Sequence, residues 1–286
     1  MPDVPMALWI IIAGMLGLLV GSFLNVVILR LPARMAATWE REAHEILELD
    51  TEQAPLPPGI VKEPSHCPSC KHRLSVIDNI PLFSWLLLRG RCRYCQTKIS
   101  IQYPLVELLT AVLSAAIVWK LGPSWQGLAG LLLTWTLIAL SGIDFRTQLL
   151  PDQLTLPLLW LGLLLALLPM FATAPAAIVG AAVGYLSLWS VYWLFKLLTG
   201  KEGMGHGDFK LLAALGAWLG PASLLPIILL SSLVGSALGC ILIVTRRHNR
   251  DVAMPFGPFI ATAGWIWFIA GDRLLHWYLT AFSTPG

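Results

Sequence analysis

The chain has 286 residues, of which 57% are hydrophobic and only 12% are charged. Soluble domains carry about 25% charged residues, and long apolar runs without charge indicate membrane spans. The composition therefore excludes an ordinary soluble globular protein, and a formal net charge of +3 is too small to indicate a nucleic-acid partner.

The first apolar run covers residues 7–29. It is longer than the apolar core of a signal peptide, and the preceding MPDVPMA carries no basic residue. We therefore expect a retained transmembrane helix that contacts the lipid bilayer.

A polar insertion follows at residues 30–103. Residues 40–63 are acidic and then proline-rich, which predicts a short amphipathic helix followed by a solvated loop.

Two cysteine pairs lie inside this insertion, CPSC at 67–70 and CRYC at 92–95, with 21 residues between them. Two such knuckles can offer four thiolates to one tetrahedral Zn²⁺ ion. The alternatives are two disulfides or four idle thiols, and a cytoplasmic location disfavours disulfides. Because all four positions are cysteines, we expect a structural zinc site formed by Cys67, Cys70, Cys92 and Cys95. Cys240 lies in an apolar run and is interpreted as a small apolar residue.

Seven further apolar runs follow the insertion, at 104–120, 126–143, 154–171, 175–198, 209–221, 223–245 and 255–271. The run 209–221 is short for a bilayer. The prediction is an all-α polytopic membrane protein with about eight transmembrane helices and a small cytoplasmic zinc-ribbon-like insertion. Its expected parts are a first helix at 1–29, a cytoplasmic domain at 30–103 and a seven-helix membrane domain at 104–286. The pairs Gly180/Gly184 and Gly235/Gly239 are interpreted as helix-packing positions.

The basic residues predict the orientation. With 30–103 in the cytosol, alternation places 144–153, 196–208 and 246–254 on the same side. These segments and Lys210 hold all of the 19 basic residues except Lys120 and Arg273. Both termini would then face the exterior.

Four acids lie in or beside the apolar runs: Glu107, Asp144, Asp152 and Asp208. Intramembrane carboxylates are costly and indicate function. Asp144 ends one predicted helix and Asp208, in GMGHGDFK, begins another, and both are expected at the cytoplasmic side. If they meet, they would share a proton, as in aspartyl hydrolysis, where one carboxylate activates water and the other polarises the carbonyl.

Other interpretations of these acids stay open at this stage. Asp208 could be a helix N-terminal residue that the helix dipole favours. Asp144 could be an interfacial acid beside Arg146. Asp152 is interpreted as a helix N-cap. Glu107 could instead pair with Lys98 or Arg93. His206 is expected to contact backbone or solvent. A proton-coupled transporter could also use the two aspartates, and a scaffold of a secretion machine would leave them incidental.

Six ordered motifs resemble one family, the type IV prepilin peptidases, a branch of the membrane aspartic proteases with a Gly-x-Gly-Asp signature. They are GSFLNVVILRLP, CPSC with CRYC, ISIQYPLVELL, IDFRTQLLPDQLTLP, GMGHGDFKLLAALGAWLG and PFGPFIATAG. The resemblance covers nearly the whole chain.

The resemblance implies that Asp144 and Asp208 are catalytic and lie near the cytosolic face of a bacterial inner membrane. It also implies prepilin or type II secretion pseudopilin substrates, cut just after a glycine at the end of a basic leader. The branch with the cysteine-rich insertion then methylates the new N-terminal amine with S-adenosylmethionine.

The methyl-donor site is not assigned by the sequence. No GxGxxG follows a predicted strand, so a soluble Rossmann domain is not expected. The segment 30–103 and the residues Gly21, Ser22, Asn25 and Glu107 lie at a suitable depth. Glu107 could steer an amine, and Ser22 and Asn25 could equally be helix-packing contacts.

Overall fold

The apolar runs fold into helices, and the two cysteine pairs lie in the irregular insertion between them. The computed structural model describes residues 5–49, 55–61, 63–75, 77–244 and 254–282. Within these ranges the chain has no β-strand, only the isolated bridges His66 to Arg73 and Arg91 to Lys98. The α-helices are α1 Met6–Ile46, α2 Phe83–Leu87, α3 Gln102–Leu121, α4 Trp125–Thr147, α5 Asp152–Leu165, α6 Ala174–Thr199, α7 His206–Leu219, α8 Leu224–Val244 and α9 Gly257–Phe282.

The chain divides into two units, residues 1–139 and 140–286, and the boundary falls inside α4. Two short 3₁₀ turns complete the elements, Ile77–Asn79 in the first unit and Pro221–Ser223 in the second.

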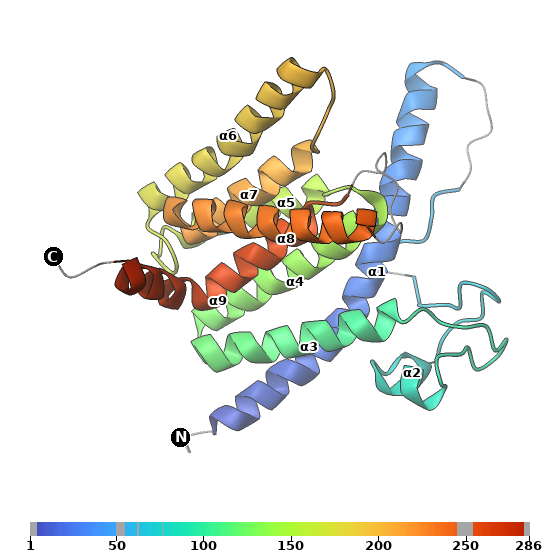
Figure 1. The fold of residues 1–286 in the computed structure, drawn as a ribbon. Coiled ribbons are helices and arrows are strands. Elements are labelled where there is room, and N and C mark those ends of the chain that lie inside the picture. The colour runs from blue at the N-terminus through green and yellow to red at the C-terminus, as the bar shows by residue number, and fades with distance from the viewer. Residues whose placement is uncertain (1–4, 50–54, 62, 76, 245–253, 283–286) are drawn as a thin grey trace. The chain divides into compact units, whose positions relative to one another are not determined.

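In the first unit, α1 crosses α3 in direct backbone contact (Figure 1). A Cβ atom on Gly17 would lie 2.7 Å from the Cα atom of Ala111, and one on Gly21 would lie 2.7 Å from that of Glu107. Only glycine permits this separation, because any side chain there would push the helices apart.

Helix α1 is much longer than the predicted span 7–29. It continues through Pro32 to Ile46 as one helix of 41 residues. The segment ARMAATWEREAHEI is rich in good helix formers, so the helix extends beyond the apolar part. The short separate helix expected within 40–63 is therefore wrong, because these residues first continue α1. An irregular stretch at residues 55–61 follows, in line with the expected loop.

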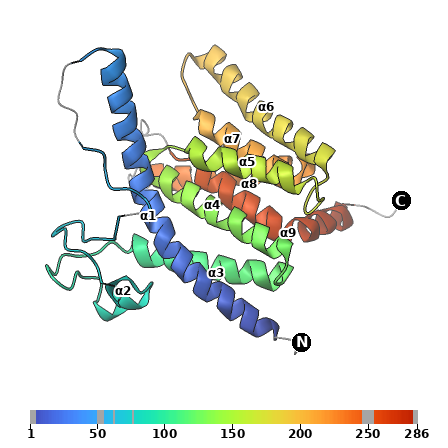
Figure 2. The ribbon, with the colours of Figure 1, turned by 180° about the vertical axis from the view of Figure 1, so that it is seen from behind.

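In the second unit, α7 is the buried centre. Ten of its residues are buried, and α6 runs beside it in both ribbon views (Figure 2). Gly180 and Gly216 pack backbone against backbone, and Gly184 lies against the Leu212 carbonyl. The Trp218 indole N–H donates to the Leu158 carbonyl at 2.8 Å, which ties α7 to α5. The expected packing role of Gly180 and Gly184 is confirmed.

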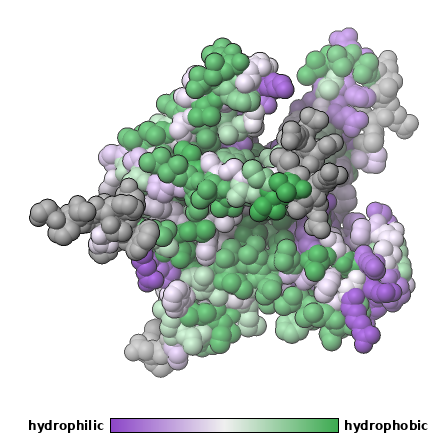
Figure 3. All heavy atoms as spheres, viewed as in Figure 1, coloured by the Kyte–Doolittle hydropathy of each residue, from purple (hydrophilic) through white to green (hydrophobic). Residues whose placement is uncertain are grey.

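The chain is an all-helical, multi-pass membrane protein. Among the described residues, five stretches are long and apolar enough to cross a membrane: α1, α3, α4, α6 and Pro221–Ile241. Many large apolar side chains are exposed, such as Met15, Leu19 and Trp160, and apolar side chains gather over the helices (Figure 3). Water would disfavour such a surface, and lipid accommodates it.

All eight predicted spans are helices, and their number as spans stays a prediction. Helices α5 and α7 have 14 residues each, about 21 Å at 1.5 Å per residue, against a hydrocarbon core of about 30 Å. The predicted basic segment 246–254 lies outside the described residues apart from Met254.

Candidate active site and metal centre

Asp144 lies in the last turns of α4, and its side chain faces the interior of the second unit. The residue is 4% exposed. Its Oδ2 atom accepts a hydrogen bond from the Gly257 backbone N–H at 2.9 Å, 113 residues along the chain. The first residue of α9 therefore holds this carboxylate in place.

Asp208 lies in the first turn of α7 and is 6% exposed. Gly205 occupies the N-cap position, where the extended backbone begins the helix. The N-terminal end of a helix dipole favours a negative charge, so this position suits a carboxylate.

The two aspartates lie in one region of the second unit, because Leu150 packs against Gly207, next to Asp208, and against Gly257, which bonds Asp144. A Cβ atom on Gly207 would lie 2.6 Å from the Leu150 Cβ, and one on Gly257 would lie 3.1 Å from its Cδ2. The glycines at 207 and 257 thus let three backbone segments converge on the carboxylates.

Asp152 is separate from this pair. Pro151 occupies the N-cap position of α5, and the Asp152 carboxylate accepts two hydrogen bonds from Lys210 Nζ, at 2.7 and 2.8 Å. The predicted N-cap role is therefore wrong, because the carboxylate is used in an ion pair with α7. The pair is partly exposed and contributes about 0 to 1 kcal/mol.

The segment before Asp208 is held by the end of α6. Lys196 Nζ donates to Glu202 Oε1 at 2.8 Å and to the Tyr192 hydroxyl at 3.3 Å. The hydrogen bond from Lys196 lowers the pKa of Glu202. The His206 ring packs on Tyr192 and Phe209, with centroid separations of 5.0 and 5.3 Å. His206 is exposed, which agrees with the expected solvent contact, and its ring also packs against aromatic side chains at the start of α7.

The four cysteines of the insertion form one cluster. The Sγ atoms of Cys67, Cys70, Cys92 and Cys95 all lie within 4.8 Å of one another, and none is in a disulfide. Four sulfur ligands at this separation fit a tetrahedral Zn²⁺ site with no open position. The arrangement favours a single four-thiol metal site over the two-disulfide alternative. Cys240 is exposed on α8 in the second unit and is not one of the clustered cysteines.

The two cysteine knuckles have the same backbone design. The N–H of Cys67 donates to the His72 carbonyl and that of Cys92 to the Thr97 carbonyl, each at 2.9 Å. The residue after the second cysteine, Lys71 or Gln96, has φ of +58°. Hydrogen bonds with the hydroxyl and backbone of Thr97 lower the pKa of Cys95 to about 6, which favours the thiolate that a metal binds.

A hydrogen-bonded pair braces the second knuckle. Arg93 Nε donates to Asp78 Oδ1 at 2.7 Å, and the Asp78 side chain is only 2% exposed. The Ser75 hydroxyl also donates to this carboxylate at 2.7 Å, and Ser75 and Arg93 together lower the pKa of Asp78.

Glu107 is buried in α3, 6% exposed, and faces the insertion. Its Oε2 atom accepts a hydrogen bond from the Leu82 N–H at 2.7 Å. Leu82 has φ of +63°, and the following N–H donates back to Pro81 in a tight, strained turn. The expected pairing with Lys98 or Arg93 is wrong, because Arg93 binds Asp78 and no ion pair among the described residues includes Glu107.

Family models match both parts of the chain. The bacterial peptidase A24 N-terminal domain matches residues 15–121, and the type IV leader peptidase family matches residues 131–240. A prepilin leader peptidase/N-methyltransferase of Xanthomonas campestris pv. campestris is 60% identical over 93% of each chain. Proteins with the same name from Aeromonas hydrophila and Pseudomonas aeruginosa are 57% and 54% identical over 93% of this chain and 92% and 91% of their own. No solved structure matches the chain.

The chain belongs to the type IV leader peptidase family.

In this member of the leader peptidase family, the structure adds one residue to the candidate active site that sequence reasoning did not single out. Gly257 lies in the PFGPF motif, for which no role was predicted. Its contact with Asp144 depends on a backbone N–H, which leaves no side-chain signal in the sequence.

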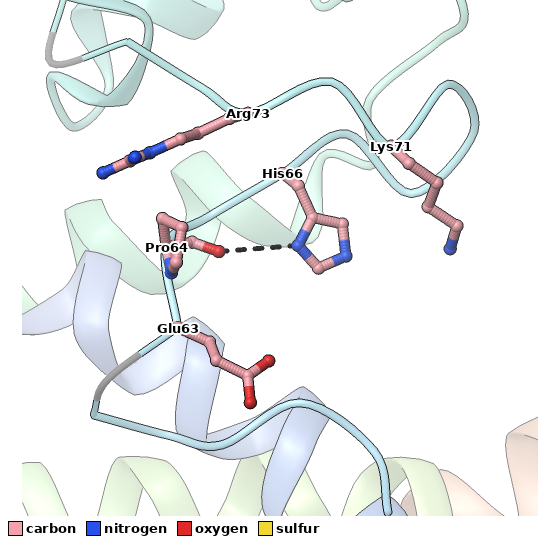
Figure 4. A pocket seen from close by; sticks show the side chains of 5 residues that line it. All are labelled: Glu63, Pro64, His66, Lys71 and Arg73. Carbon is pink, nitrogen blue, oxygen red and sulfur yellow. Dashed lines mark hydrogen bonds between the residues drawn. The ribbon is translucent and has the colours of Figure 1, made fainter. Parts of the chain in front are cut away.

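An open pocket of about 330 Å³ lies beside the first knuckle (Figure 4). Glu63, Pro64, His66, Lys71 and Arg73 line it. Arg30, from α1, donates to the carbonyls of Gly59, Glu63 and Pro64 at 2.6 to 3.1 Å, so α1 holds one wall of this pocket.

Proposed function

We propose that this chain cleaves the leader peptide of prepilins or pseudopilins and then methylates the new N-terminal amine. The single observation that carries the proposal is a pair of buried carboxylates, Asp144 and Asp208, on segments that both pack against Leu150, in a chain of the leader peptidase family. The names of relatives up to 60% identical support both activities and give no support to the proton-coupled transporter.

Asp144 and Asp208 are proposed as the catalytic pair. One carboxylate takes a proton from water, whose oxygen attacks the scissile carbonyl carbon, while the other, protonated, donates to the carbonyl oxygen. The carbon–nitrogen bond then breaks, and the leaving nitrogen receives a proton and becomes the free amine. The Gly257 N–H would hold Asp144 in position during this sequence.

The proposed substrate has to be extended at the cut, because a helix engages its carbonyls in hydrogen bonds. Three glycines lie in the five residues before Asp208: Gly203, Gly205 and Gly207. They provide a backbone with little steric bulk beside this carboxylate. We propose that the prepilin helix enters laterally from the bilayer of the bacterial inner membrane, with its leader on the cytosolic side.

The cysteine cluster is proposed to hold one structural Zn²⁺ ion through Cys67, Cys70, Cys92 and Cys95. When bound, the ion would supply a cross-link that fixes the two knuckles. The chain's own residues prepare the site, since the paired backbone turns direct all four sulfurs inward.

Methylation is proposed to follow cleavage with S-adenosylmethionine as the donor. The neutral amine attacks the methyl carbon, the carbon–sulfur bond breaks with its electrons on sulfur, and the nitrogen loses a proton. The insertion and the adjoining ends of α1 and α3 are proposed as its location.

Leader cleavage can be measured as the decrease in size of a prepilin that is expressed together with this chain. Asp144→Asn and Asp208→Asn should each lower leader cleavage by at least about 100-fold, because each removes one proton-transfer group. The matched control is Asp152→Asn, which lies near α7 but outside the pair and should cleave normally. Normal cleavage by both Asp144→Asn and Asp208→Asn would refute the proposed pair.

A further inference from the structure

A buried acceptor at the crossing of α1 and α3 has no donor. Asn25 is 1% exposed, and its Nδ2 group donates to the carbonyls of Tyr103 at 3.0 Å and Gly21 at 3.3 Å. These two bonds fix the orientation of the amide. The Oδ1 atom is then buried with no hydrogen-bond partner among the described residues. Such a group costs about 1 to 3 kcal/mol, and native proteins rarely leave one unpaired.

Glu107 places a second buried acceptor group, a carboxylate, at the same crossing. Gly21 of α1 packs on the Glu107 Cα atom of α3. One helical turn further along the crossing, Asn25 of α1 donates to the Tyr103 carbonyl of α3. Asn25 and Glu107 therefore lie about one helical turn apart at this crossing. The carboxylate has about four acceptor positions, and the Leu82 N–H uses one of them. A buried carboxylate is strongly unfavourable in its charged form unless a cation pairs with it. A cationic ligand would supply that partner for Glu107.

A primary ammonium group matches both features. It carries three N–H donors and one positive charge, so it can bond Asn25 Oδ1 and Glu107 together. A water molecule would satisfy the amide and leave the charge uncompensated. A hard metal ion needs about six oxygen ligands, more than this site offers. Ser22 and Tyr103 are only half-buried, so the site can be reached from its edge.

We propose that Glu107 and Asn25 bind the primary ammonium group of one of the two methylation substrates. This inference rests on the proposed function. Two substrates carry a primary ammonium group: the cleaved pilin, at its new N-terminus, and the methyl donor, in its amino-acid portion.

The experiment uses the full-length, zinc-loaded protein in lipid nanodiscs, with a cleaved pilin peptide and S-adenosylmethionine. Glu107→Gln and Asn25→Leu should each raise the KM of one substrate about 10- to 100-fold, the effect of losing a hydrogen bond to a charged group. Glu107→Asp keeps the charge and should lose less. A rise in the peptide KM assigns the site to the pilin amine, and a rise in the donor KM assigns it to the donor.

A binding measurement adds a readout besides turnover. If the ligand is the pilin amine, the wild type should bind a free-amine peptide more tightly than its N-acetylated form, and Glu107→Gln should bind both equally. If it is the donor, Glu107→Gln should bind S-adenosylhomocysteine more weakly. The matched control is Thr110→Val, whose hydroxyl is satisfied within α3 by the Val106 carbonyl at 2.7 Å and which packs on the same Gly21.

The failures are distinguishable. A wild type that cleaves and never methylates would refute the proposed methyltransferase function. A wild type that methylates, with both KM values unchanged in Glu107→Gln and Asn25→Leu, would overturn only the ammonium site. Equal loss of cleavage and methylation in these variants would also overturn it, since the residues would then act only on the fold.

Discussion

The contact between Gly257 and Asp144 in the candidate active site leaves little room for a side chain at position 257. Gly257 donates its N–H to Asp144, and a Cβ atom on this glycine would lie 2.7 Å from the same Oδ2 atom. Real Cβ atoms essentially never approach another atom so closely. A larger residue at position 257 would therefore have to displace the Asp144 carboxylate or the Leu150 side chain.

Gly257→Ala tests this contact. The added methyl group should displace the Asp144 carboxylate or the Leu150 side chain, at a cost of about 1 to 3 kcal/mol. Leader cleavage should fall about 10-fold or more, measured as kcat on a purified prepilin.

Gly239→Ala provides the control for Gly257→Ala. Its Cβ would lie 3.4 Å from the terminal methyl of Met254, which can move, so cleavage should be unchanged. A Gly257→Ala protein with normal kcat would contradict the positioning role.

At the scale of elements, the insertion is a small fold held by few contacts. Each knuckle has one bridge and one tight turn, and only short helices, α2 and the 3₁₀ turn Ile77–Asn79, lie between them. So small a segment cannot bury enough apolar surface to fold alone, and metal ions supply that stability in such domains. The proposed peptidase pair lies in the other unit and does not use these cysteines.

Cys67→Ser together with Cys92→Ser should remove about one zinc per chain, because two of four ligands are lost. Methylation of the mature N-terminus should fall more than leader cleavage, because the knuckles lie in the unit that carries the proposed methylation site. Metal analysis and the mass of the processed pilin measure the two effects.

Cys240→Ser is the matched control for the zinc site, since this thiol is not one of the four clustered cysteines. It should keep both zinc and activity. Equal loss of cleavage and methylation in the double variant would mean that zinc stabilises the whole protein, and a wild type without zinc would refute the metal site.

At the scale of the whole molecule, the number of spans decides which side each loop faces. Helix α7 is short but buried on nearly all sides by α5, α6 and α9. A helix surrounded by protein does not have to match the bilayer thickness, because its ends contact neighbouring segments rather than lipid. We therefore keep the prediction of eight spans, with α7 as one of them.

Tags cleavable by an external protease test this topology. In cells whose outer membrane has been permeabilised, a protease site inserted at residues 122–124 or at the C-terminus should be cut. A site inserted at residues 200–203 should be protected, because basic loops stay in the cytosol. If α7 did not span, the C-terminal site would be protected instead.

Several features of the fold were predictable because they depend on local sequence. Each apolar run became a helix, and the spacing of the cysteine pairs predicted a cluster that the structure contains. The full length of α1 was missed because the polar residues after the apolar run were assigned to a separate short helix, whereas good helix formers at 33–46 continue the first one. The predicted depth of Asp144 and Asp208 allowed them to pair, the family resemblance implied that they do, and their roles stay a prediction.

The sequence by itself determined the membrane class, the helices and the candidate metal ligands, since hydropathy and spacing act over a few residues. Only the tertiary structure decided the partners of the buried acids: Leu82 for Glu107, Lys210 for Asp152 and Gly257 for Asp144. These contacts join positions 25 to 113 residues apart, and two of the three donors are backbone N–H groups. Every residue except proline has that donor, so nothing in the sequence marks which one a buried carboxylate will find.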